Sequence, residues 1–217
     1  KTKVIPNITI KENIWGDPNC TRTINKKYGP HGIDLIKRND GRYQLGVINH
    51  YPDESVEMFE MIKKENSWDM VWRGCIDVPY EFYFNDISLR KNGGFYASHM
   101  YDREITLNEW LFVSIIKSDT GFLVEWIDNR FKKIDGSDGS GPNGIALDED
   151  SNIIYINYNQ GDSITKFDLS LNKKLDEDIN SEIRAIAFNC FENFGNYPID
   201  KFKDHLKTIT QESKHQL

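Results

Sequence analysis

Three stretches of the chain have nearly the same form: Pro30-His31-Gly32-Ile33-Asp34-Leu35, Phe84-Asn85-Asp86-Ile87-Ser88-Leu89 and Pro142-Asn143-Gly144-Ile145-Ala146-Leu147. Each places a polar side chain before an Ile-x-Leu alternation, which is typical of a half-buried strand. A polar turn and a second apolar run follow each stretch. The sequence therefore predicts one hairpin that occurs three times.

The spacing of these stretches predicts the fold. His31, Asn85 and Asn143 recur at intervals of 54 and 58 residues, slightly more than the roughly 40–50 residues of a four-stranded propeller blade. A third strand is predicted in each unit, at Val56–Glu60, Phe122–Trp126 and Ile164–Asp168. A solenoid is the alternative, but its units are usually shorter or helical. We expect an all-β fold, a β-propeller.

The repeat divides the chain into three parts. Residues 1–29 are expected to form an N-terminal arm, residues 30–170 three clear blade repeats, and residues 171–217 a degenerate fourth repeat with a polar tail. In that fourth repeat Arg184 stands where the other units have His or Asn. We expect a single propeller, or a propeller fragment, of about three to four blades that is incomplete at both ends.

Composition excludes some classes of function. The 217-residue chain has a net charge of −7 with interspersed charges, which argues against a nucleic-acid surface. It has no apolar run of the roughly 18 residues that a membrane span needs. The three cysteines, Cys20, Cys75 and Cys190, allow one disulfide with one free thiol, or three thiols. The compartment stays open, with a secreted, periplasmic or membrane-peripheral location favoured over the cytoplasm.

The segment from Ile105 to Ile116 is unusually apolar. It is too short to span a bilayer and too apolar for a simple loop. It is either a buried helix or strand, or an insertion over the mouth of the site that shapes a substrate pocket or touches a membrane surface.

The propeller geometry predicts a site at the starts of the inner strands. These strands surround the axis, so we expect His31, Asn85 and Asn143 to point toward one end of the central tunnel. Amide oxygens together with carboxylates suit Ca²⁺, which takes about six to eight oxygens, better than zinc, which prefers His and Cys. Calcium is therefore the predicted metal.

Six ordered blocks between about residues 15 and 170 resemble one family. The blocks are Trp15–Cys20, Pro30–Leu35, Val47–His50, Ser55–Phe59, Asn85–Ile87 and Gly141–Ile145. They resemble the serum paraoxonase/arylesterase group, within the wider gluconolactonase and strictosidine-synthase-like superfamily. The resemblance implies a six-bladed propeller that holds one catalytic and one structural Ca²⁺ in its tunnel and hydrolyses lactones and esters.

The resemblance also implies which residues bind calcium. Asn85 and Asn143 would be ligands of the catalytic ion, and Asp86 would bind the structural ion together with the backbone carbonyl of Ile33. The family supplies further ligands from an acidic pair in its first blade and an Asp-Asn pair in its fifth, and neither is found in this sequence. Neutral oxygens alone hold Ca²⁺ weakly, and the guanidinium of Arg184 near the axis would repel it.

The histidines have implied roles as well. His31 and His50 match the two histidines of a proposed proton-handling dyad, and His99 falls where the family often has a polar residue lining the pocket. A histidine can take the proton of a water near neutral pH while a second histidine orients the first. Calcium would polarise the carbonyl as a Lewis acid.

Two functions follow from these observations. The first is a calcium-dependent hydrolase that acts on a small-molecule lactone or a carboxylic (aryl) ester. The second is a truncated, non-catalytic propeller-like binding or scaffold protein that has lost part of the calcium site. The missing ligands leave three explanations: an internal piece of a longer enzyme, a truncated relative without catalysis, or a ring completed by another chain.

Overall fold

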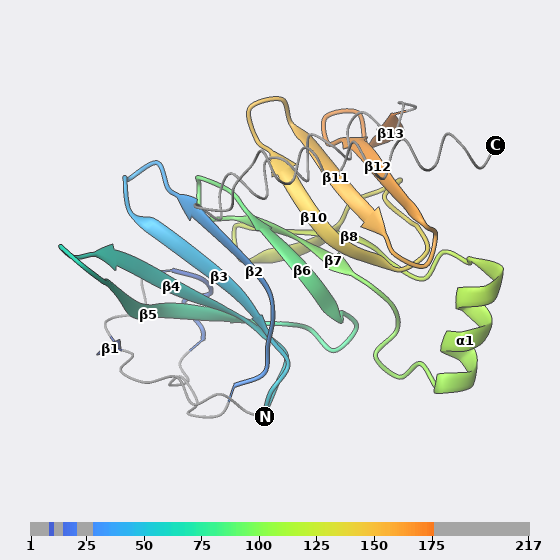
Figure 1. The fold of residues 1–217 in the computed structure, drawn as a ribbon, viewed down its shortest axis with the longest axis horizontal. Coiled ribbons are helices and arrows are strands. Elements are labelled where there is room, and N and C mark those ends of the chain that lie inside the picture. The colour runs from blue at the N-terminus through green and yellow to red at the C-terminus, as the bar shows by residue number, and fades with distance from the viewer. Residues whose placement is uncertain (1–8, 11–14, 21–27, 176–217) are drawn as a thin grey trace, which may run out of the picture. The chain divides into compact units, whose positions relative to one another are not determined.

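The computed structural model describes residues 9–10, 15–20 and 28–175. These residues form three sheets, and in each of them four strands that are consecutive in sequence pair antiparallel (Figure 1). In the first sheet a short additional strand pairs parallel with the fourth of these strands. Such four-stranded antiparallel meanders are consistent with propeller blades, so the predicted all-β propeller class is confirmed. Arg184 and the rest of the predicted fourth repeat from residue 176 onward lie outside the described residues.

The strands have the following bounds and order. The first sheet, ordered β1-β5-β4-β3-β2, contains β1 (Thr9–Ile10), β2 (Pro30–Lys37), β3 (Tyr43–Asn49), β4 (Ser55–Lys63) and β5 (Trp68–Asp77), with β1 parallel to β5. The second contains β6 (Phe84–Leu89), β7 (Phe95–His99), β8 (Phe122–Ile127) and β9 (Arg130–Lys133). The third contains β10 (Pro142–Asp148), β11 (Ile153–Tyr158), β12 (Ser163–Asp168) and β13 (Lys173–Leu175).

The three predicted hairpins match the inner strands of the three sheets. Two of their three turns contain a glycine with positive φ, Gly41 (83°) and Gly93 (100°), a conformation that is disfavoured for a residue with a Cβ. The fourth strand of each sheet was not predicted, and the third sheet continues through β13 to Leu175.

The core lies between successive sheets because alternate residues of the central strands face opposite sides. One cluster joins the first two sheets and includes Ile48, Met58, Phe84 and Phe95. A second cluster joins the second and third sheets and is built from residues of both, among them Leu123, Ile154, Ile156 and Phe167. Each fully buried side chain of this size contributes about 1.5–3 kcal/mol, so contact between sheets is the main source of stability.

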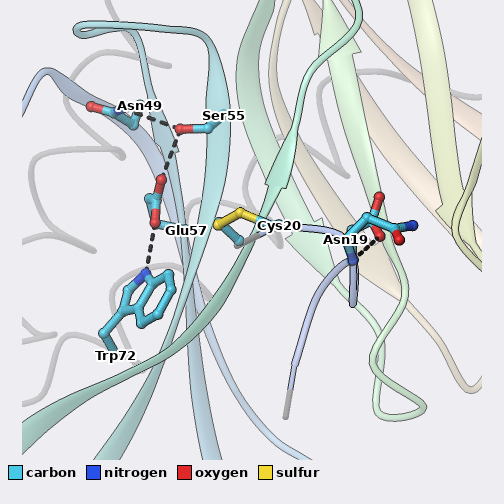
Figure 2. The surroundings of a disulfide bond; sticks show 8 residues. Asn19, Cys20, Asn49, Ser55, Glu57 and Trp72 are labelled. Atoms are coloured by element: carbon cyan, nitrogen blue, oxygen red, sulfur yellow. Dashed lines mark hydrogen bonds between the residues drawn. A yellow bond between two sulfur atoms is a disulfide. The ribbon is translucent and has the colours of Figure 1, made fainter. Parts of the chain in front are cut away.

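A disulfide attaches the N-terminal segment to the outer strand of the first sheet. Cys20 pairs with Cys75 of β5, with Cα atoms 5.7 Å apart (Figure 2). The backbone amides of Trp15 and Asp17 donate to the carbonyls of Arg73 and Cys75, which satisfies part of the edge of β5. Of the two alternatives for the cysteines, the bridge is therefore the one observed, and it points to an oxidising or extracellular location. Cys190 lies outside the described residues.

The apolar segment between β7 and β8 forms helix α1 (Leu107–Ile116). Thr106 caps its N-terminus in a capping box with Glu109, a motif of the type Thr-x-x-Glu. No residue of the helix is buried, and Leu107, Phe112 and Ile115 are 71%, 62% and 79% exposed. The prediction of a buried element is therefore wrong. In the part of the chain that the structure describes, no helix is long and apolar enough to cross a membrane.

Candidate active site

Each inner strand begins with a β-bulge. The pairing register shifts between Pro30 and Ile33 in β2, between Phe84 and Ile87 in β6 and between Pro142 and Ile145 in β10. His31, Asn85 and Asn143 are each the first residue inside the bulge. A bulge reorients the side chains that it contains, so the three predicted residues occupy the same irregularity in three successive sheets.

The three inner strands lie side by side and are joined by matching hydrogen bonds (Figure 1). Asp34 of β2 accepts the backbone N–H of Leu89 in β6 at 2.7 Å. Ser88 of β6 accepts the backbone N–H of Leu147 in β10 at 3.2 Å. Asp34 and Ser88 hold the same position in the repeat, as do Leu89 and Leu147. The side-chain contacts therefore follow the repeat that the sequence predicts and bring the three strand starts to one end.

His31 and His50 contact each other directly. Nδ1 of His31 lies 2.8 Å from Nε2 of His50. On its other side, Nδ1 of His50 lies 2.8 Å from both carboxylate oxygens of Glu54, and Tyr83 stacks on the His50 ring at 4.9 Å between centroids. Partial burial lowers the pKa of His31, His50 lowers it further, and the Glu54 charge opposes both. The structure thus brings the two predicted histidines together.

Asn49 anchors the loop that carries His50. Its Oδ1 accepts the backbone N–H of Gly29 at 2.9 Å, next to the start of β2, and its Nδ2 donates to Ser55 Oγ at 3.2 Å. Figure 2 shows how this contact continues from Ser55 to Glu57 and from Glu57 to the indole N–H of Trp72. Asn49, Ser55 and Glu57 are fully or almost fully buried, and a buried polar group without a partner is costly. This network therefore holds the loop at a fixed distance from β2.

Asp86 lies between the inner strands. Its Oδ2 accepts the backbone N–H of Ile145 at 2.9 Å. Burial raises the pKa of the Asp86 carboxyl to about 6, and the nearby Asp34 adds to the rise. A Cβ placed on Gly32 would lie 2.6 Å from Asp86 Oδ1, so the segment of β2 that leads into Ile33 passes directly beside the carboxylate.

Of the two predicted asparagines, Asn143 is linked to Asp86 through Ser98 of the second sheet. Ser98 Oγ accepts the backbone N–H of Asp86 at 3.0 Å and donates to the backbone carbonyl of Asn143 at 2.6 Å. Asn85 is 7% exposed, and its Nδ2 donates to the sulfur of Met100. Ser98 therefore links the backbone of Asp86 to the backbone of Asn143, whereas the amide of Asn85 bonds to Met100.

These residues fit calcium in the type of donor that they offer. Within the described ranges, no group of three or more His, Cys, Asp or Glu side chains could hold a metal, so the donors would be one carboxylate together with amide and backbone oxygens. Ca²⁺ binds oxygens of all three kinds. A cation beside Asp86 would also offset the burial that raises the pKa of its carboxyl.

His99 lies apart from the dyad. It is 5% exposed and packs against Phe122, with ring centroids 4.7 Å apart. Its Nδ1 accepts the backbone N–H of Tyr83 at 3.0 Å, and burial lowers its pKa to about 4. The structure therefore gives this residue a place in the core of the second sheet, and the predicted pocket-lining role stays a prediction.

A cavity of about 440 Å³ opens beside the dyad. It is lined by His50, Pro52, Asp53, Glu54, Asp77, Val78, Tyr80 and Arg103. Sequence reasoning missed Glu54, because an acidic residue four positions after a histidine in a loop is not a recognised motif. Only the spacing to His50 could have indicated it.

Comparison with protein-family models gives one match, to the Arylesterase family over residues 19–196. A search of curated proteins found no match. The family match spans the dyad, the three inner-strand starts and the first-sheet disulfide, and it covers most of the chain. The chain therefore belongs to the paraoxonase/arylesterase family, whose fold is a β-propeller.

Proposed function

We propose that the chain is a calcium-dependent hydrolase of lactones or carboxylic (aryl) esters. Membership of the arylesterase family points to ester or lactone hydrolysis. The observation that carries the mechanism is the 2.8 Å contact between His31 and His50, because two hydrogen-bonded imidazoles can accept a proton from water and share it.

His31 acts as the general base in this proposal. Its side chain is exposed, so water can reach the ring. Partial burial and the neighbouring His50 lower its pKa, which keeps the imidazole neutral and able to accept a proton near neutral pH. His50 orients His31 and is itself held by the loop that Asn49 anchors.

Asn85 and Asn143 would hold the catalytic calcium, and Asp86 with the backbone carbonyl of Ile33 the structural one. When bound, calcium supplies Lewis-acid polarisation of the substrate carbonyl. Asp86 has a second task that depends only on the chain itself, since it ties β6 to β10 through the N–H of Ile145.

The proposal is tested by hydrolysis of phenyl acetate and of a simple aliphatic lactone. We expect activity that is lost in EGTA and restored by Ca²⁺, with a thermal midpoint that falls when calcium is removed. His31→Gln should lower kcat by about 10²–10⁴-fold. Asn143→Ala should weaken calcium binding, so that a higher calcium concentration is needed for activity. Asn39→Ala, which changes an exposed turn residue, is the matched control. A protein that hydrolyses neither probe and melts identically with and without EGTA would be the non-catalytic binding or scaffold alternative.

We also propose that α1 contacts a membrane surface. The apolar side chains of Leu107, Phe112 and Ile115 are exposed, and their removal from water at the lipid boundary would be favourable. Phe112→Asp should reduce co-sedimentation with phosphatidylcholine vesicles, whereas Asn108→Asp, which adds the same charge to an exposed polar position of the helix, should change it less. Equal co-sedimentation of the wild type and Phe112→Asp would contradict a role for α1.

A further inference from the structure

We propose that Glu54 is a positioning residue that sets the tautomers of both histidines, so that Nε2 of His31 is the atom that receives the proton from water. This inference rests on the proposed function and names the atom at which its proton transfer occurs. The supporting contacts form one continuous chain, from the Glu54 carboxylate to His50 Nδ1 and from His50 Nε2 to His31 Nδ1, each step measuring 2.8 Å.

The first step sets the tautomer of His50. An ionised carboxylate can only accept hydrogen bonds. Both oxygens of Glu54 lie within hydrogen-bond distance of His50 Nδ1, so that nitrogen carries the hydrogen. In the neutral ring the other nitrogen, Nε2, then carries a lone pair and acts as an acceptor.

The second step sets the tautomer of His31. Because His50 Nε2 accepts, the partner atom His31 Nδ1 must donate across the 2.8 Å contact. The neutral His31 ring then carries its lone pair on Nε2. Without the carboxylate, either ring could donate to the other. The lone pair would then be on His31 Nε2 in only part of the molecules.

The reaction balances with these atoms. His31 Nε2 takes one proton from water as the water oxygen forms a bond to the carbonyl carbon of the ester or lactone, and the electron pair of the carbonyl π bond moves to the carbonyl oxygen. The resulting positive charge can move to His50 when the His31 Nδ1 proton shifts to His50 Nε2, where the Glu54 carboxylate stabilises it. As the carbonyl double bond re-forms and the carbon–oxygen bond to the leaving group breaks, the proton on His31 Nε2 passes to the leaving oxygen. The proton on His50 Nε2 returns to His31 Nδ1 across the 2.8 Å contact, so both histidines return to their first state.

The position of Glu54 is supported from several sides. Its side chain is only 9% exposed, so water screens its interaction with His50 less than at a surface ion pair. Its backbone carbonyl accepts the N–H of Val78 at 3.1 Å, and Tyr83 stacks on the opposite partner, His50. The pair is therefore part of the packed loop structure, with its orientation set by backbone and ring contacts.

The test compares Glu54→Gln with Glu81→Gln, which removes the same charge from an exposed loop residue. Long-range ¹H–¹⁵N spectra of the imidazole rings report the tautomers, with the two rings assigned from His31→Gln and His50→Gln. We expect hydrogen on Nδ1 of both histidines in the wild type, and a mixture of tautomers in Glu54→Gln. Phenyl acetate hydrolysis should show a kcat lower by about 10²-fold or more in Glu54→Gln, with a smaller change in KM, and no such change in Glu81→Gln.

The two measurements separate the two proposals. If the wild type hydrolyses neither the aryl ester nor the lactone, the proposed function fails, and the spectra alone decide the role of Glu54. Hydrogen on Nε2 of His50 in the wild type, or a Glu54→Gln protein with the wild-type ring spectrum, would overturn the role of Glu54 whether or not the protein is an enzyme.

Discussion

Replacing Gly32 with alanine should destabilise the protein through the contact between its first two inner strands. A Cβ at this position would lie 2.5 Å from the backbone oxygen of Asn85 and 2.5 Å from the Cα of Asp86. Both atoms belong to the backbone of β6 and cannot rotate away. Since unstrained non-bonded carbon contacts lie near 3.5–4.0 Å, β2 and β6 would have to separate by about 1 Å.

The size of the effect follows from this overlap. Overpacking of this kind costs about 1–3 kcal/mol, and at this chain length 1 kcal/mol corresponds to about 2–4 °C in the thermal midpoint. We therefore expect Gly32→Ala to lower Tm by roughly 2–12 °C. Differential scanning calorimetry of both proteins in the same buffer measures the change directly.

Gly144 offers a matched control because it holds the same position in the bulge of β10. A Cβ there would meet only Asp86 Oδ2, at 3.8 Å, an ordinary contact distance. Neither glycine has a positive φ angle, so backbone strain would not account for a difference in Tm between the two variants. Equal midpoints for Gly32→Ala and Gly144→Ala would refute the close approach of β2 to β6.

Two further predictions concern the disulfide and pH. Reduction of the Cys20–Cys75 bridge, which closes a span of 55 residues, should cost about 4 kcal/mol of unfolding free energy by the loop-entropy relation; urea denaturation with and without a reducing agent measures it, and identical midpoints would contradict it. Burial holds the pKa of His99 in the folded state at about 4, below the value of about 6.5 in the unfolded state. The unfolded state therefore binds the proton first as the pH falls. The unfolding free energy should decrease between about pH 6.5 and pH 4, by up to roughly 3 kcal/mol. The difference in unfolding free energy between wild type and His99→Asn, measured across this pH range, isolates that contribution, and a constant difference would rule it out.

Local pattern was sufficient for the repeated hairpins. The polar residue, the Ile-x-Leu alternation and the following turn depend on strand geometry and on backbone conformations of glycine and asparagine, which are local properties. In the structure, equivalent positions of the repeat form the three bulges, and the equivalent residues Asp34 and Ser88 make matching contacts with the next inner strand. The outer strands β5, β9 and β13 lack such a pattern, since much of each of them is exposed or only half-buried.

Burial and partners were decided by the tertiary structure. The sequence by itself determined that Ile33 and Leu35 alternate like Ile87 and Leu89, yet the first pair is 54% and 53% exposed and the second 1% and 3%. The reason is position: β6 lies between β2 and β10, whereas the described residues place an inner strand on only one side of β2. The contact of His50 with Glu54 likewise depends on how the loop folds back, because a hydrogen bond is set by distance and direction in space, which residue types along a chain do not specify.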